Sequence, residues 1–141
     1  MNIETYKPEY KEAFIAMNLA WIEEMFQVED EDRMVLGSIE ERLANGGEIF
    51  FAINDEGEIM ASCMVAPLPS GEWEIEKFAA KKEFAGQGIG SEVLTFIKYM
   101  FIDPDNKTGC RFLIVDAVNS PEVLSFYEKM DSIICLQQRS K

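Results

Sequence analysis

Three glycines within five residues, Gly86, Gly88 and Gly90, limit what this chain can fold into more than any other feature of its sequence. They follow a segment in which polar and apolar residues alternate as in a strand, and they open a stretch with apolar residues at helical spacing. The first N–H groups of a helix have no partner within it, and glycine lets an anion approach them without a Cβ in the way. The turn therefore predicts a backbone cradle for a phosphate-bearing ligand.

The glycine turn alone leaves the kind of ligand open. A Gly-x-Gly-x-Gly run is a weak signal, because some such runs are only tight connections. A dinucleotide-binding fingerprint would have a further glycine where this chain has Ser91, and it would follow an opening strand. The Gly-Lys-Ser/Thr sequence of a P-loop is also missing. Another kind of nucleotide-binding domain is thus a minor alternative.

The rest of the chain has the periodicities of a sheet covered by helices. Strands are predicted at Met1–Tyr6, Glu48–Asn54, Glu58–Ala66, Glu72–Ala80, Cys110–Val118 and Ser132–Gln138. Helices are predicted at Glu9–Gln27, between the acidic run 29–32 and Asn45, at Gly88–Ile102 and from Ser120 to Met130. Antiparallel hairpins come first and crossovers later, which predicts an α/β (α+β) fold. Its mixed, mostly antiparallel central sheet would be flanked by helices in one domain, residues 1–141.

Charge and the missing histidine narrow the classes of function. The chain has 26 acidic and 13 basic side chains and a net charge of −13, which argues against binding nucleic acid or an anionic membrane surface. A cationic or amine ligand would be attracted, unless the acidity only keeps the protein soluble. Without histidine, Ser-His and Cys-His catalysis and histidine metal sites are excluded, and no metal is expected.

The three cysteines, Cys63, Cys110 and Cys135, all lie in apolar runs that are typical of strands. Their odd number and setting predict buried, reduced thiols, which suits the cytosol. The N-terminus has no signal-peptide pattern, and no apolar run is long enough to span a bilayer. A soluble cytoplasmic protein is therefore expected.

A second motif lies near the C-terminus. From Val115 to Lys129 the chain reads VDAVNSPEVLSFYEK, a strand, then Asn119, then a helix that ends in Phe-Tyr-x-Lys. Together with FAGQGIG from Phe84 to Gly90, this resembles the GNAT superfamily of acetyl-CoA-dependent N-acetyltransferases, whose central motif is Arg/Gln-x-x-Gly-x-Gly/Ala after a strand. The resemblance covers nearly the whole chain, and the two motifs together are more specific than either alone.

The resemblance implies direct transfer of an acetyl group from acetyl-CoA to an amine, without an acyl-enzyme. The main-chain N–H groups of the turn would hold the pyrophosphate, and Asn119 would belong to the same cofactor site. The residues of that turn are Gly86, Gln87, Gly88, Ile89, Gly90 and Ser91. The strand residues Phe78, Ala79 and Ala80 would pair with the pantetheine arm. A main-chain N–H near Phe78 would polarise the acetyl carbonyl.

Two side chains are candidates for proton transfer. The resemblance implies that Tyr127 protonates the leaving thiolate, although a packed helix tyrosine is the alternative. For the base, strand alternation places Glu74, Glu76 and Phe78 on one face. Glu74 stands where some family members carry a catalytic glutamate, Glu76 is the alternative, and an ordered water could replace both.

Three departures from the family pattern bear on function. Ala85 stands where Arg or Gln is usual, so we expect weak CoA binding that relies on main-chain N–H groups. Asp131-Ser132 replaces the usual Gly-Phe after the last helix. The family commonly has one more strand than this chain, whose sheet would then have an open edge that a homodimer covers. A degenerate acyl-CoA-binding or dimerising module is therefore the alternative function.

The acceptor of the acetyl group is implied to lie near the first two helices. That region carries Trp21, Phe26, Glu29, Asp30 and Asp32. The aromatic side chains are more typical of a core, and the acidic run is more typical of a solvated helix start. The sequence therefore predicts a small-molecule or peptide amine without identifying it.

Overall fold

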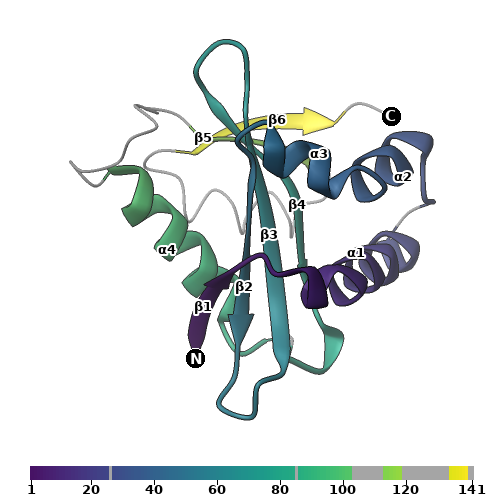
Figure 1. Cartoon of the computed structure of the whole chain (residues 1–141), viewed down its shortest axis with the longest axis vertical. Coiled ribbons are helices and arrows are strands. Elements are labelled where there is room, and N and C mark those ends of the chain that lie inside the picture. Colours follow the sequence, from purple (N-terminus) through teal and green to yellow (C-terminus); the bar gives the residue numbers. More distant parts are fainter. Residues whose placement is uncertain (26, 85, 103–112, 119–133, 140–141) are drawn as a thin grey trace.

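Six strands form one sheet in the computed structural model of the chain, in the order β1-β2-β3-β4-β5-β6 (Figure 1). The structure describes residues 1–25, 27–84, 86–102, 113–118 and 134–139. The strands are β1 (Asn2–Thr5), β2 (Glu48–Ile53), β3 (Ile59–Pro67), β4 (Trp73–Ala80), β5 (Leu113–Val118) and β6 (Ile134–Arg139). The first four strands pair antiparallel, whereas β5 runs parallel to both β4 and β6. The predicted mixed sheet is confirmed, and β5 lies inside it as its apolar sequence indicated.

Helices cover both faces of this sheet. The helices α1 (Lys11–Met25), α2 (Asp30–Leu36) and α3 (Ile39–Ala44) lie on one face, and α4 (Ile89–Ile102) lies on the other (Figure 1). Two short 3-10 helices, η1 (Pro8–Tyr10) and η2 (Lys82–Phe84), precede α1 and the glycine turn. Each helix turns an apolar side to the sheet because burial of that side stabilises the fold.

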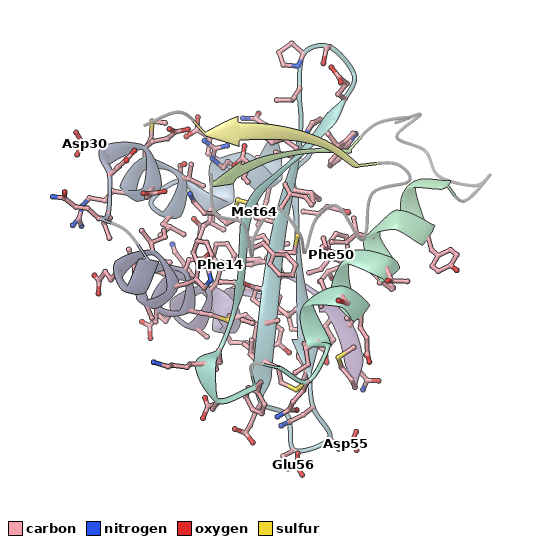
Figure 2. The ribbon with its side chains drawn as sticks, turned by 180° about the vertical axis from the view of Figure 1, so that it is seen from behind. Phe14, Asp30, Phe50, Asp55, Glu56 and Met64 are labelled. Carbon is pink, nitrogen blue, oxygen red and sulfur yellow. The ribbon has the colours of Figure 1, made fainter. Side chains whose placement is uncertain are left out.

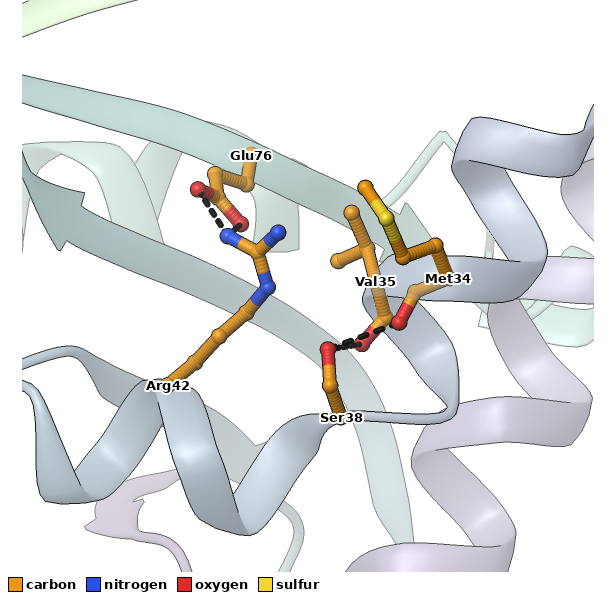
Figure 3. A network of polar contacts seen from close by, with 5 residues as sticks. All are labelled: Met34, Val35, Ser38, Arg42 and Glu76. Carbon is orange, nitrogen blue, oxygen red and sulfur yellow. Dashed lines mark hydrogen bonds and ion pairs between the residues drawn. The ribbon is translucent and has the colours of Figure 1, made fainter.

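The single helix expected before Asn45 is two helices, and this is a correction to the prediction. Gly37 ends α2, where its N–H donates to the carbonyl of Arg33 at 2.9 Å. Ser38 precedes α3, and its Oγ donates to the carbonyl of Met34 at 2.7 Å (Figure 3). Glycine favours helix ends because it loses more backbone entropy inside a helix than other residues do. Serine favours them because its hydroxyl competes for backbone hydrogen bonds. The apolar spacing survives the break, since Leu36 and Ile39 are both buried.

Two apolar cores sandwich the sheet. Phe50 and Phe51 are neighbours on β2, yet they belong to different cores because strand side chains alternate between faces. Phe51 meets the ring of Phe14 from α1 at a centroid distance of 6.1 Å, and Phe50 packs in the core under α4. Figure 2 shows Phe14 on the α1 side and Phe50 on the α4 side.

Strand β4 contains a bulge at its middle. Val65 of β3 pairs with Ile75, and the next residue, Met64, pairs with Lys77, so that Glu76 is an extra residue on β4. The pairing of β4 with β5 ends at the same place, with Ile75 and Val115. Beyond it, residues 77–80 of β4 pair with β3 alone among the described strands. Among the described residues, β5 therefore does not pair with this last part of β4.

Candidate functional site

A pocket of about 290 Å³ lies where the end of β4 meets the N-terminus of α4. Its lining residues are Ala80, Phe84, Gly86, Gly88, Ile89, Gly90 and Ser91. The pocket therefore joins the two segments that the sequence assigned to one ligand, the strand end and the glycine turn. Phe78 and Ala79 do not line it, and Gln87 is exposed to solvent.

The backbone of the turn explains its glycines. Gly86 has φ +81° and Gly88 has φ +75°, a left-handed conformation that side chains disfavour. A Cβ built on either residue meets no atom of the described residues within 4 Å. Internal packing is thus not the reason for glycine here, and both positions face open space that a ligand can enter.

The start of α4 supplies donors at the same place. The N–H of Glu92 donates to the carbonyl of Gly88 at 3.1 Å, which is the first bond of the helix. The N–H groups of the three preceding residues, Ile89 to Ser91, have no partner of that kind. These N–H groups, with the positive end of the helix dipole, fit a pyrophosphate.

The bulge corrects one prediction about β4. Trp73 and Ile75 pack in the core under α4, and so does Phe78, whereas Ala79 packs in the core under α1 to α3. Regular alternation would put Ile75 and Ala79 on the same face. Glu74 and Glu76 thus share a face, as expected, but Phe78 lies on the other one. The predicted common face of these three residues is wrong because one extra residue shifts the alternation.

Glu76, the alternative base, is held by an ion pair. Arg42 of α3 donates from Nη1 to both carboxylate oxygens of Glu76, at 2.5 and 2.6 Å (Figure 3). The two side chains are 25% and 12% exposed, so the pair is largely shielded from water. This charge-assisted contact joins the Glu76 carboxylate to α3. Glu74 is half-buried on the same face.

Next to Glu76, Lys77 forms a second ion pair that the sequence did not reveal. Its Nζ lies 2.8 Å from Oδ1 of Asp32 in α2, and both side chains are less than a tenth exposed. Oδ2 of Asp32 accepts the N–H of Glu29 at 3.0 Å and so caps the helix. Asp32 was expected in a solvated acidic run, but it is buried. One feature of the sequence could have indicated this pair. Glu76 and Lys77 are consecutive charged residues, and they interrupt the alternation of polar and apolar residues along β4.

Several residues that the sequence analysis singled out lie outside the part of the chain that the structure describes. Asn119 and Tyr127 lie outside the described residues, as do Ala85, Phe26 and Cys110. Trp21 is half-buried.

Cys63 is a buried free thiol, as predicted, and desolvation raises its pKa far above the usual value. This thiol therefore stays protonated and supplies no nucleophile.

Within residues that the structure describes, His, Cys, Asp and Glu side chains form no group of three that could hold a metal ion. In the same part of the chain, no helix is long and apolar enough to cross a membrane.

The comparison with protein families gives a match over most of the chain. The model of the Acetyltransferase (GNAT) family matches residues 8–131. No curated protein has a matching sequence.

Solved structures share the fold at low identity. An acetyltransferase of the GNAT family from Staphylococcus aureus Mu50 has a TM-score of 0.72 at 20% identity, over 91% of this chain and 80% of that one. A possible acetyltransferase from Clostridium difficile 630 has a TM-score of 0.75 at 13% identity, over 99% and 95%. A predicted acetyltransferase with acetyl-CoA from Clostridium acetobutylicum has a TM-score of 0.67 at 15% identity, over 91% and 86%.

Proposed function

Since this chain belongs to the acetyltransferase (GNAT) family, we propose that it moves an acetyl group from acetyl-CoA to a primary amine of a small molecule or peptide. One observation carries the proposal. A single pocket joins the strand end at Ala80 to the left-handed glycines Gly86 and Gly88 and to the start of α4. This pocket offers main-chain N–H groups to a pyrophosphate at the end of β4, a strand to which an extended amide-bearing arm can add.

The proposed roles follow from these positions. N–H groups of residues 86–91 hold the pyrophosphate, and the β5-facing edge of Phe78 to Ala80 pairs with the pantetheine arm. In the reaction the amine nitrogen bonds to the thioester carbonyl carbon, the carbon–sulfur bond breaks, the nitrogen loses a proton, and the sulfur gains one. A main-chain N–H near Phe78 stabilises the negative charge on the carbonyl oxygen. Tyr127 is the proposed acid, and Asn119 the proposed further contact of the cofactor.

The proposal is tested by calorimetry with acetyl-CoA, followed by an assay of free thiol with a panel of amines. We expect binding with Kd at or below roughly 1 mM, on the weak side because Ala85 replaces the usual Arg or Gln. ATP and NAD serve as control ligands and should give no comparable heat. An absence of binding to acetyl-CoA at millimolar concentration would contradict the proposal.

A second function, a non-catalytic acyl-CoA-binding or dimerising module, rests on the same departures from the family pattern. The observation that favours it is Ala85, which removes a side-chain contact to the cofactor. Binding of acetyl-CoA without thiol release across the amine panel would support this alternative. Release of thiol with any amine would exclude it.

Glu74 is the proposed general base, because it stands where some members of the family carry a catalytic glutamate. We expect Glu74→Gln to lower kcat about tenfold or more and to remove the acidic limb of the pH–rate profile. Binding of acetyl-CoA should stay within about twofold, because the side chain lies away from the glycine turn. Steady-state kinetics from pH 5 to 9 measures both effects. Glu72→Gln, two residues earlier in the loop before β4, is the matched control. Unchanged turnover in Glu74→Gln would assign the proton transfer to water instead.

A homodimer and a cytoplasmic location stay proposals. Among the described strands β6 pairs with β5 alone, and a second copy could cover its other edge. Light scattering that returns a monomer at micromolar concentration would contradict the dimer. The cytoplasmic location rests on the free thiol of Cys63 and would be checked by cell fractionation.

A further inference from the structure

The bulge of β4 sends two neighbouring charged residues to the same helical layer. Glu76 pairs with Arg42 of α3, and Lys77 pairs with Asp32 of α2. In a regular strand, neighbouring side chains point to opposite faces of the sheet. Only the extra residue at Glu76 lets both side chains reach helices on one face (Figure 3 shows the Glu76 contact).

The Lys77 ion pair favours the bulged register over a regular one. Without the bulge, regular alternation from Trp73 and Ile75 would carry Lys77 to the face under α4, where the core is apolar. A buried ammonium with no partner is costly. With the bulge, the same ammonium lies 2.8 Å from the carboxylate of Asp32. The ion pair and the bulge therefore depend on each other.

The position of the bulge links this register to the ligand pocket. The pairing of β4 with β5 ends at Ile75, one residue before the bulge. Residues 77–80 of β4 pair with β3 and not with β5, and this segment ends at Ala80, which lines the pocket. A change of register at Lys77 would alter which main-chain groups this segment presents.

We propose that the Lys77–Asp32 ion pair is a positioning element that holds the β4 bulge, and through it the strand edge that receives the acyl-CoA arm. This inference rests on the proposed function for the identity of the arm. Neither Lys77 nor Asp32 is assigned a contact with the ligand or with the reacting atoms. The carboxylate of Asp32 also accepts a hydrogen bond from the N–H of Glu29, and so it fixes the start of α2 as well.

The test uses a double variant, Lys77→Met with Asp32→Asn. Losing both charges together leaves no unpaired buried charge, so the variant should fold, and the asparagine side chain keeps an oxygen for the N–H of Glu29. The matched control is Lys11→Met with Glu40→Gln. That pair also has an Nζ to Oε1 distance of 2.8 Å, but it links the start of α1 to α3, and neither partner belongs to β4.

Two measurements are made on each folded variant. Calorimetry should show acetyl-CoA binding weakened about tenfold in the Lys77/Asp32 variant and within about twofold of wild type in the control. Amide hydrogen exchange, without ligand, should be about tenfold faster at residues 77–80 of β4 relative to residues 49–52 of β2, again only in the Lys77/Asp32 variant.

The two measurements separate this inference from the proposed function. If wild type binds no acetyl-CoA, the proposed function fails, and the exchange pattern alone then decides whether the pair holds the bulge. Faster exchange that is equal in β2 and β4 would show that the pair only adds global stability, and would overturn the inference. Unchanged acetyl-CoA affinity in a folded variant would overturn it as well.

Discussion

Replacing Gly88 by valine is expected to weaken acetyl-CoA binding about 100-fold or more, the largest effect on affinity that we expect from any one substitution. Gly88 has φ +75°, where a β-branched side chain is strained, and its surroundings are open. The added side chain either displaces the turn or occupies the space in front of the α4 N–H groups. Both outcomes remove the cradle, and calorimetry with acetyl-CoA measures the loss.

Gly71→Val is the matched control for this substitution. Gly71 has φ +90° and also has no atom of the described residues within 4 Å of a Cβ, but it lies in the turn before β4, at the opposite end of that strand from Ala80. Both variants should lose a similar stability of about 1–2 kcal/mol in chemical denaturation. Only Gly88→Val should lose affinity for the ligand. An equal loss in both would mean that strain, and not the cradle, caused it.

Tyr127→Phe is expected to lower kcat about 100-fold and to leave the Kd of acetyl-CoA within about twofold. The substitution removes one hydroxyl and keeps the ring, so packing is preserved while the proposed proton donor to the leaving thiolate is lost. Steady-state kinetics with the best amine of the panel, together with calorimetry, separates turnover from binding.

The control for Tyr127 is Tyr99→Phe on α4, whose side chain is 66% exposed. It should change neither turnover nor binding. Equal turnover of Tyr127→Phe and wild type would remove this residue from the mechanism and would favour a packed aromatic. A loss of binding as large as the loss of turnover would instead indicate damage to the cofactor site.

A charged side chain of β4, Lys77, is buried between the sheet and α2. Lys77 lies in a strand whose residues are buried or half-buried, and its ammonium is accommodated because Asp32 supplies a carboxylate from α2. Ion pairs of this kind add little net stability compared with apolar residues, but breaking one leaves a buried charge. Such pairs therefore serve better to select one register than to raise the free energy of unfolding.

The sequence alone determined the strands, the helices α1 and α4 and the glycine turn, because these depend on local periodicity and backbone preference. The predicted helix from Ser120 to Met130 lies outside the described residues. The stripe of Ile89, Val93 and Ile97 and the glycines before it could be interpreted without any distant residue. The break of the second helix at Gly37 was missed, since the apolar spacing on its two sides still points inward.

Only the tertiary structure decided how β4 is built and what its charged residues do. Lys77 and Asp32 are 45 residues apart, and Glu76 and Arg42 are 34 apart, so no local pattern could pair them. The sequence placed Phe78 on the face of Glu76, and a single extra residue reverses that. A strand's faces follow its register, and register depends on which distant partners make a buried charge tolerable. That dependence is energetic and long-range, and so it became visible only when the helices had been placed on the sheet.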